Sequence, residues 1–336
     1  MKLNDHVQHL RARVGTIQLL AFSLLALLGT RLYYLQIVRG DYFSERAESQ
    51  RVRLIPIPAP SGAIFDRYGK LLVDSRPTYN IVISNDGLKS LNTDNRIEAY
   101  SGGLKLDRQF VIDRIALIKK QNDFESLVLK ENVSIPDITW VEAHSLEFPE
   151  LRVELQPQRH YPLGTSLAHV LGYVGEISPK QLEDPEYKEK GFRPGDIIGK
   201  GGLEQYYDEF LRGRPGYRKV LVDSRGRVQS ELEVVQPQSG QDLVTTIDYD
   251  LQLAAEEQLA NSSTKRGTII AMDPNNGEML AMASAPSFDP NVFVKGSSDP
   301  AGRKQIAAYW QDETRPLYNR AIQGRYPPGS TWKIPE

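Results

Sequence analysis

Residues 267–285 read GTIIAMDPNNGEMLAMASA and predict a β-hairpin. Apolar and small residues make up its two flanks, Gly267–Met272 and Glu278–Ala283. Asp273–Gly277 between them combines proline, asparagine and glycine, the residues typical of tight turns. Just upstream, Tyr249–Leu259 predicts a helix, so this part of the chain should place a helix on an antiparallel sheet. The apolar face expected for that helix comprises Leu251, Ala254, Ala255 and Leu259.

Downstream of the hairpin, the stretch Tyr326-Pro327-Pro328-Gly329-Ser330-Thr331-Trp332-Lys333 places a hydroxyl and an amine three residues apart. On a helix, positions i and i+3 share one face with Cβ atoms about 5–6 Å apart. Lys333 could then act as the general base that takes the proton of a Ser330 nucleophile, particularly if burial lowers the lysine pKa. Four-residue patterns of this kind also arise by chance, and a solvated helix face is the alternative for these two residues alone.

The composition excludes several classes of site. The chain has 336 residues, enough for two or more domains, with a net charge of −2 and a pI near 6.3. This balance gives no polybasic surface, so we expect no nucleic-acid partner. Without cysteine there is no disulfide, thiolate metal site or cysteine nucleophile. We expect no organic cofactor. We also expect no metal site, because the histidines lack ligand-like spacing. They are His6, His9, His144, His160 and His169.

An apolar stretch near the N-terminus predicts a membrane-spanning helix. No charged residue occurs from Val14 to Thr30, and an apolar and aromatic run resumes after Arg31. Counting to Tyr34 gives about 21 residues, enough for a hydrocarbon core of about 30 Å. We therefore place the anchor at residues 14–38.

The charges before the anchor predict its orientation. Lys2, Arg11 and Arg13 precede it, so residues 1–13 should form a cytoplasmic tail with the remaining chain outside the cytoplasm. A cleavable signal peptide is the alternative. It would have a shorter apolar region and a small-residue cleavage site, which Arg31–Leu35 does not supply.

The region after the anchor predicts mostly short strands. Asp41–Arg51 predicts a short helix. The glycine-rich stretch Ile198–Asp208 predicts a helix start, since it lacks the G-x-x-x-x-G-K-[ST] pattern of a phosphate loop. The predicted strands are Arg51–Pro58, two strands about a turn at Asp66–Gly69, Tyr79–Ser84, Arg152–Leu155, and a hairpin of Tyr217–Val222 with Arg227–Val234 about Asp223–Gly226.

Residues 86–150 differ in character and predict a helical insertion. Apolar residues from Phe110 to Ile118 recur in a charged background, which indicates an amphipathic helix. Asp137 could cap a second helix. No chemistry is evident in the insertion.

The turn-rich stretch Pro237–Gly240 predicts the main domain boundary. We expect a β-rich domain at residues 39–236 and a second domain at residues 237–336. After the boundary, Asp242–Ile247 predicts a strand that leads into the helix and hairpin. The fold class is α+β with an N-terminal transmembrane helix.

Several of these segments together resemble class B penicillin-binding proteins. The segments Gly267–Pro274, Leu280–Asn291, Asn319–Ala321 and Tyr326–Lys333 resemble the opening of the transpeptidase domain, up to its Ser-x-x-Lys nucleophile. The segments Ile64–Gly69, His169–Gly175 and Gly199–Asp208 resemble the dimerisation, or pedestal, domain of the same family. The resemblance implies a mixed β-rich pedestal carrying the helical insertion, followed by the N-terminal part of a penicillin-binding/β-lactamase-like domain.

The resemblance also implies an activity. The protein would be a peptidoglycan D,D-transpeptidase of cell-wall elongation that binds penicillin and other β-lactams. Ser330 would be acylated by stem peptides ending in D-Ala-D-Ala, with Lys333 as general base. The implied partners are a SEDS-family glycosyltransferase of the RodA type and elongation scaffold proteins, and the implied location is the bacterial inner membrane, with the bulk of the chain periplasmic.

Two departures from the family pattern limit these expectations. The pedestal motif usually carries an arginine where this chain has Ser61, which puts a domain or partner contact there in question. The family's Ser-x-Asn and Lys-Thr-Gly motifs do not follow Lys333 in this sequence. We therefore expect that a polypeptide of these 336 residues alone has an incomplete transpeptidase domain and forms no stable acyl-enzyme. The alternatives are a non-catalytic anchored pedestal protein that binds elongation partners and a membrane-bound β-lactam sensor, which the short cytoplasmic tail disfavours.

Overall fold

The computed structural model describes residues 20–39, 52–85, 93–120, 126–222, 228–295, 299–327 and 329. The chain forms two compact units, one of residues 1–54 and 219–233 and one of residues 55–218 and 234–336. The short helix predicted at Asp41–Arg51 lies outside the described residues.

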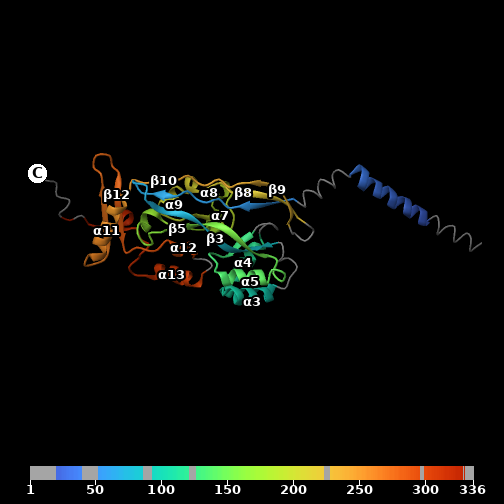
Figure 1. Ribbon diagram of the computed structural model, residues 1–336, viewed down its shortest axis with the longest axis horizontal. Coiled ribbons are helices and arrows are strands. Elements are labelled where there is room, and N and C mark those ends of the chain that lie inside the picture. The colour runs from blue at the N-terminus through green and yellow to red at the C-terminus, as the bar shows by residue number, and fades with distance from the viewer. Residues whose placement is uncertain are drawn as a thin grey trace, which may run out of the picture. The chain divides into compact units, whose positions relative to one another are not determined.

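The first unit contains the predicted membrane helix (Figure 1). It runs as one helix over Leu20–Val38, with 19 residues and a mean hydropathy of 1.4, and ends in the π-helical turn η1 (Tyr34–Val38). At 1.5 Å per residue it is about 28 Å long, close to the thickness of a bilayer core. Its leucine and phenylalanine side chains are exposed, as a lipid-facing helix requires.

Three strands form the sheet β1-β8-β9: β1 (Val52–Ile57), β8 (Gly216–Val222) and β9 (Val228–Val235). The predicted strand at Arg51–Pro58 and the predicted hairpin of Tyr217–Val222 with Arg227–Val234 are thus confirmed as elements. The connecting turn at Asp223–Gly226 lies outside the described residues.

The second unit is built on a five-stranded sheet. Its order is β10-β2-β3-β4, and β5 pairs with β3 as well. The sequence predicted separate strands at residues 71–73 and 79–84, but they form one long strand. Pro77 is tolerated inside it because Pro77 and its register partner Pro157 form a non-hydrogen-bonded pair, in which neither nitrogen has to donate to the other strand. The alternation is set by Ser84, whose N–H donates to Glu150, and by Tyr79, whose carbonyl oxygen points away from β5 to Val133. The strands are β2 (Ile64–Phe65), β3 (Leu71–Ser84), β4 (Ser126–Lys130), β5 (Leu151–His160) and β10 (Leu243–Val244).

The insertion packs helices on the far end of this sheet. It contains α3 (Thr93–Leu104), α4 (Arg108–Ile118) and α5 (Ile135–Ala143). Strand β4 lies between α4 and α5 and pairs with β3, so the insertion is not wholly helical. The cap of α5 also differs from the prediction, because Ser134 is the N-cap and Asp137 completes its capping box. The buried core that joins insertion and sheet includes Ile81, Ile83, Tyr100, Leu104, Val111 and Ile118.

Short elements follow β5 along the chain. They are α6 (Ala168–Leu171), β6 (Val174–Glu176), α7 (Pro179–Glu183), α8 (Pro185–Glu189), β7 (Ile197–Gly199), α9 (Gly202–Tyr206) and α10 (Asp208–Leu211). Strands β6 and β7 pair antiparallel. The glycine-rich stretch does begin a helix, as predicted. Gly172 and Gly201 approach closely there, since a Cβ on Gly172 would lie 1.8 Å from the Gly201 carbonyl oxygen.

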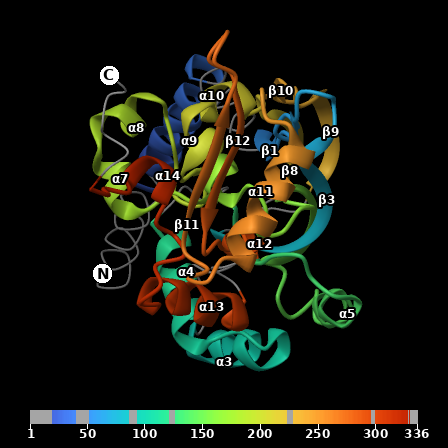
Figure 2. The same ribbon diagram turned by 90° about the vertical axis from the view of Figure 1, so that its left-hand side faces the viewer.

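The predicted helix and hairpin are confirmed as α11 (Tyr249–Asn261), β11 (Gly267–Met272) and β12 (Met279–Ala285). Figure 2 shows α11 beside the hairpin. Its buried face differs from the prediction: Ala255 and Leu259 are buried, but the fully buried residue of the first turns is Gln252, while Leu251 and Ala254 are exposed. The chain continues through α12 (Asn291–Lys295), α13 (Pro300–Gln311) and α14 (Arg320–Gln323).

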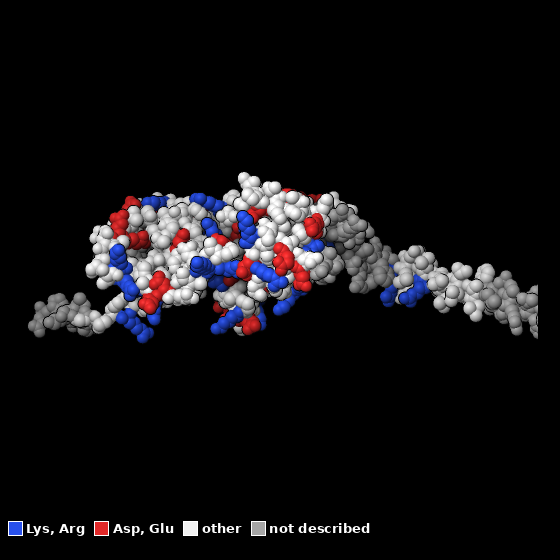
Figure 3. All heavy atoms as spheres, turned by 90° about the horizontal axis from the view of Figure 1, so that it is seen from below, with Lys and Arg blue, Asp and Glu red and all other residues white. Residues whose placement is uncertain are grey.

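Charged side chains of both signs are interspersed on the face shown in Figure 3. Some form pairs between distant elements. Arg303 of α13 lies 3.8 Å from Asp107, the N-cap of α4, and its guanidinium lies over the ring of Phe110. These contacts join the insertion to the helices that follow the hairpin.

Candidate active site

Ser330 and Lys333 lie outside the described residues, so no geometry is assigned to the pair. The structure does describe the chain that leads to them, which we call the lead-in segment, Thr314–Gln323. This segment and the elements that hold it define the surroundings of the predicted nucleophile.

The lead-in segment is folded around the side chain of Arg320. The guanidinium donates to the carbonyl oxygens of Thr314 at 2.5 Å, Arg315 at 3.2 Å and Tyr318 at 3.3 Å. Arg315 has a φ of +51°, a left-handed conformation that non-glycine residues rarely adopt. Three bonds from one planar cation therefore hold a turn that its own backbone preferences would not favour.

Asn319 begins the short helix α14 at the end of this turn. Its side-chain oxygen accepts from the N–H of Ala321 at 3.0 Å, which is an N-cap interaction. The N–H of Arg320 donates to the hydroxyl of Ser284 on β12 at 3.0 Å. The start of α14 is thereby attached to the hairpin.

Helix α6 holds the same segment from another side. Nε2 of His169, on α6, donates to the carbonyl oxygen of Pro316 at 2.8 Å. The side chain of Asn319 donates to the carbonyl oxygen of His169 at 3.2 Å. Because a carbonyl oxygen only accepts, the proton of the imidazole resides on Nε2. Burial and the charge of Arg320 lower the pKa of His169 and so favour the neutral ring, while the bond to Pro316 acts in the opposite direction.

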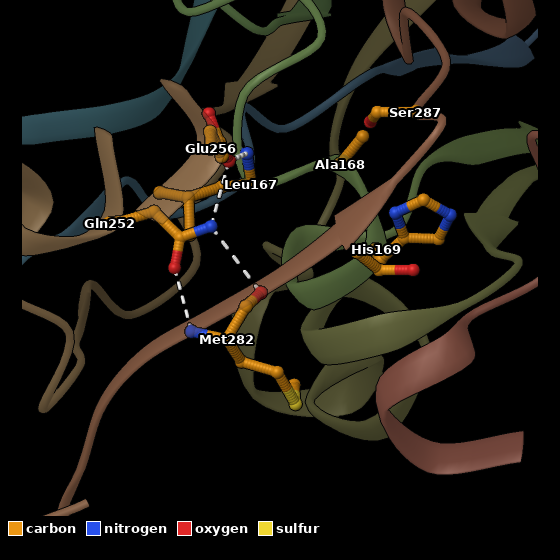
Figure 4. A pocket seen from close by; sticks show the side chains of 8 residues that line it. Leu167, Ala168, His169, Gln252, Glu256, Met282 and Ser287 are labelled. Carbon is orange, nitrogen blue, oxygen red and sulfur yellow. Dashed lines mark hydrogen bonds between the residues drawn. The ribbon is translucent and has the colours of Figure 1, made fainter. Parts of the chain in front are cut away.

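A second joint between pedestal and hairpin lies beside α11 (Figure 4). The amide of Gln252 accepts from the N–H of Met282 at 2.7 Å and donates to its carbonyl oxygen at 3.3 Å. It also donates to Glu256 at 2.7 Å, and Glu256 accepts from the N–H of Leu167 at 2.9 Å. The recess that these residues line with His169 is too narrow for a water molecule, so it is a packed joint and not a ligand cavity.

A buried ion pair joins β5 to α9. Nε of Arg159 lies 2.7 Å from Oε1 of Glu204, and both side chains are 3% exposed. The same carboxylate oxygen accepts from the hydroxyl of Tyr161 at 3.2 Å. Burial raises the pKa of Glu204 while Arg159 opposes that shift, and burial beside Glu204 raises the pKa of Tyr161 well above its usual value.

This ion pair lies next to Ser61, the residue at which the sequence differs from the family pattern. Arg159 donates to the carbonyl oxygen of Gly62 at 2.6 Å, and Ser75 donates to that of Ser61 at 3.1 Å. Ser61 and Gly62 are thus fixed through their backbones. The guanidinium of Arg159, from β5, places a positive charge against the backbone next to Ser61.

The sequence patterns did not single out Gln252, Glu256 or the role of His169. Gln252 and Glu256 are spaced i, i+4 on a predicted helix, a signal that could have suggested an interacting pair. Among the described residues, no group of three or more histidine, aspartate and glutamate side chains could hold a metal ion.

Comparison with known proteins finds a family match for two stretches of the chain. The penicillin-binding protein dimerisation domain model matches residues 56–245, and the penicillin binding protein transpeptidase domain model matches residues 267–336. The peptidoglycan D,D-transpeptidase MrdA of Acinetobacter baumannii is 38% identical over 96% of this chain and 46% of its own length. The protein of the same name from Escherichia coli is 36% identical over 96% of this chain and 50% of its own length.

Solved structures show the same similarity. Penicillin-binding protein PBP2, in its complex with MreC from Helicobacter pylori, is 25% identical with a TM-score of 0.56, covering 80% of this chain and 48% of that one. A chain of a peptidoglycan synthase complex is 30% identical with a TM-score of 0.51, covering 92% of this chain and 52% of that one. The chain spans about half the length of the curated relatives it matches. Since the dimerisation-domain model alone matches more than half of its residues, the chain belongs to the penicillin-binding protein family.

Proposed function

We propose that this protein is a peptidoglycan D,D-transpeptidase of cell-wall elongation, with Ser330 as the acyl-ester nucleophile and Lys333 as its general base. The observation that carries the proposal is the position of this Ser-x-x-Lys pair within residues 267–336, the stretch matched by the transpeptidase model. The names of the relatives from Acinetobacter baumannii and Escherichia coli support the same reaction.

The reaction begins on a stem peptide that ends in D-Ala-D-Ala. Lys333 takes the proton of Ser330 as Oγ bonds to the penultimate carbonyl carbon, and the C–N bond to the terminal D-Ala breaks with protonation of its amine. The N–H of Ser330, which the sequence predicts at a helix start, would donate to the developing oxyanion. The amine of a neighbouring stem peptide then attacks the ester, forms the crosslink and restores the Ser330 hydroxyl. A β-lactam would acylate the same oxygen.

The proposed location and domain plan follow the anchor helix. Residues 1–13 would lie in the cytoplasm and residues 14–38 in the inner membrane, with a pedestal at 39–236 and the transpeptidase domain from 237 in the periplasm. The spanning capacity of Leu20–Val38 and the positive charges before it support this orientation.

The proposed partners are a SEDS-family glycosyltransferase of the RodA type and an elongation scaffold protein. The similarity to a chain of a peptidoglycan synthase complex supports the first partner. The similarity to PBP2 in its complex with MreC supports the second. Their contacts would lie on the anchor and the pedestal.

Labelling with a fluorescent penicillin tests the activity in cells that express the protein from its own gene. Mass spectrometry should locate the adduct on Ser330. The label should disappear in Ser330→Ala, fall strongly in Lys333→Ala and persist in Ser263→Ala, a control at an exposed serine in the same domain. An adduct on any other residue would refute the assignment of the nucleophile.

A complementation test separates this function from a non-catalytic one. If the Ser330→Ala variant supports growth and cell shape as well as the wild type does, the protein acts as an anchored binding partner and the transpeptidase proposal is wrong. Loss of complementation together with retained copurification of the partners supports the enzyme.

A further inference from the structure

We propose that His169 is a positioning residue, which holds the lead-in segment on the pedestal and thereby fixes the approach of the chain to Ser330. The inference rests on the proposed function, because it assigns His169 a part in acylation at that serine.

His169 is itself firmly placed. It lies on α6 between Ala168 and Val170, which are 1% and 8% exposed. The residue before this helix, Leu167, has a φ of +60° and donates its N–H to Glu256 on α11. The imidazole packs edge-on against the ring of Phe288, with centroids 5.3 Å apart. A side chain anchored at its backbone and at its ring can hold a second segment in a defined place.

The contact with the lead-in segment is reciprocal. His169 donates from its ring to Pro316 and accepts at its backbone carbonyl from the side chain of Asn319. Pro316 lies inside the turn that Arg320 holds together, and Asn319, which follows the turn, also caps α14. One residue of the pedestal therefore controls the place where α14 begins. From α14 the chain proceeds to Ser330.

The protonation of His169 is compatible with this role. The lead-in segment carries two arginines, Arg315 and Arg320, and the charge of Arg320 is the one that lowers the pKa of His169. Glu256 lines the recess beside His169 from α11. A neutral ring avoids a second positive charge beside Arg320 and still supplies the Nε2–H that Pro316 requires.

Two substitutions separate the hydrogen bond from the ring packing. His169→Phe keeps a ring against Phe288 and removes the donor to Pro316. His169→Gln removes the ring and restores an N–H donor. The matched control is His144→Phe in the insertion, because Nδ1 of His144 bonds to the Trp140 carbonyl at 2.8 Å and its ring stacks on Trp140 at 4.6 Å.

The first measurement is amide hydrogen exchange of the purified chain. The N–H groups of Tyr318, Arg320 and Gln323 are bonded to Arg315, Ser284 and Asn319 and report on the lead-in segment. We expect His169→Phe to speed their exchange roughly two- to tenfold, as loss of one hydrogen bond implies, with exchange in α11 unchanged. His169→Gln should recover part of the protection, and His144→Phe should leave the segment unaffected.

The second measurement is the rate of acylation by labelled penicillin in the protein expressed from its own gene. His169→Phe should lower the acylation step about three- to tenfold with little change in the concentration for half-maximal rate, because positioning acts on the step and not on binding. Unchanged exchange in the lead-in segment of His169→Phe would overturn the inference. Absence of acylation in the wild-type protein would instead overturn the proposed function and leave the exchange result standing.

Discussion

Replacing Arg159 by methionine should destabilise the pedestal more than any single surface change. Arg159→Met keeps the length of the side chain and removes its charge and its donors. Glu204, which is 3% exposed, would then lack its cation, and among the described residues the hydroxyl of Tyr161 would be its remaining side-chain donor.

The magnitude follows from the bonds that are lost. Arg159 donates to Glu204 at 2.7 Å and to the Gly62 carbonyl at 2.6 Å, both in the interior. Hydrogen bonds to charged groups contribute about 1.5–3 kcal/mol each, and removing one partner of a buried ion pair costs about 3–5 kcal/mol. We therefore expect a loss of about 4 kcal/mol, which shifts a urea midpoint by about 1.3–2 M for a slope of about 2–3 kcal/mol per M.

Urea unfolding followed by the fluorescence of Trp140 measures this change. Trp140 packs against the insertion core that includes β3, and β3 pairs with the strand that carries Arg159. Replacing Trp310 and Trp332 by phenylalanine makes the signal specific for the insertion core around Trp140. The control is Arg76→Met, an arginine on β3 whose side chain is 54% exposed and pairs with Asp74, where a cost below about 1 kcal/mol is expected.

The double variant Arg159→Met/Glu204→Gln tests the reason for the loss. Neutralising Glu204 removes the uncompensated buried charge, so the double variant should be more stable than Arg159→Met alone. Equal costs for Arg159→Met and Arg76→Met, or a double variant that is no more stable than the single one, would refute the reasoning.

Two further predictions concern the pedestal. Burial, assisted by Glu176 and opposed by Arg114, raises the pKa of Glu131 from 4.5 to about 7. The folded state then holds a proton that the unfolded state releases, so the stability of the fold falls as pH rises from about 4.5 to 7. Glu131→Gln should therefore flatten the dependence of the thermal midpoint on pH between about pH 5 and 8. Gly172→Ala should cost well above the about 1–2 kcal/mol of a left-handed alanine, because its Cβ would meet the Gly201 backbone, whereas Gly191→Ala, with a similar φ of +72° and open space, should cost only that amount in the same assay.

Local patterns in the sequence predicted the elements whose causes are local. The turn residues Asp273–Gly277 specify the hairpin, and the glycines before Leu203 specify a helix start. The same reasoning divided β3 into two strands, and Pro77, a residue type that usually ends a strand, lies between them. Only the register with Pro157, a residue far along the chain, shows why the strand continues.

The surroundings of the candidate site depend on contacts between distant residues, which periodicity does not report. Gln252 occupies a position that an apolar stripe would leave to leucine, because its amide satisfies the backbone of Met282. The bonds between His169 and Pro316 and between Arg159 and Glu204 likewise join separate segments. Ser330 and Lys333 were recognised by motif alone, and their geometry stays a prediction.

The bonds of Gln252 also determine how the hairpin can grow. In an antiparallel pair, both backbone groups of a residue point either to the partner strand or away from it. The N–H and C=O of Met282 bond to Gln252, so they point away from β11. On that outer edge the side-chain amide of Gln252 bonds to both backbone groups of Met282, and the N–H of Asp248 donates to the carbonyl oxygen of Leu280. This edge of β12 is closed to strand addition, which protects the protein from edge-to-edge aggregation there. Any further strand that joins the hairpin, from this chain or from another molecule, must therefore pair with β11.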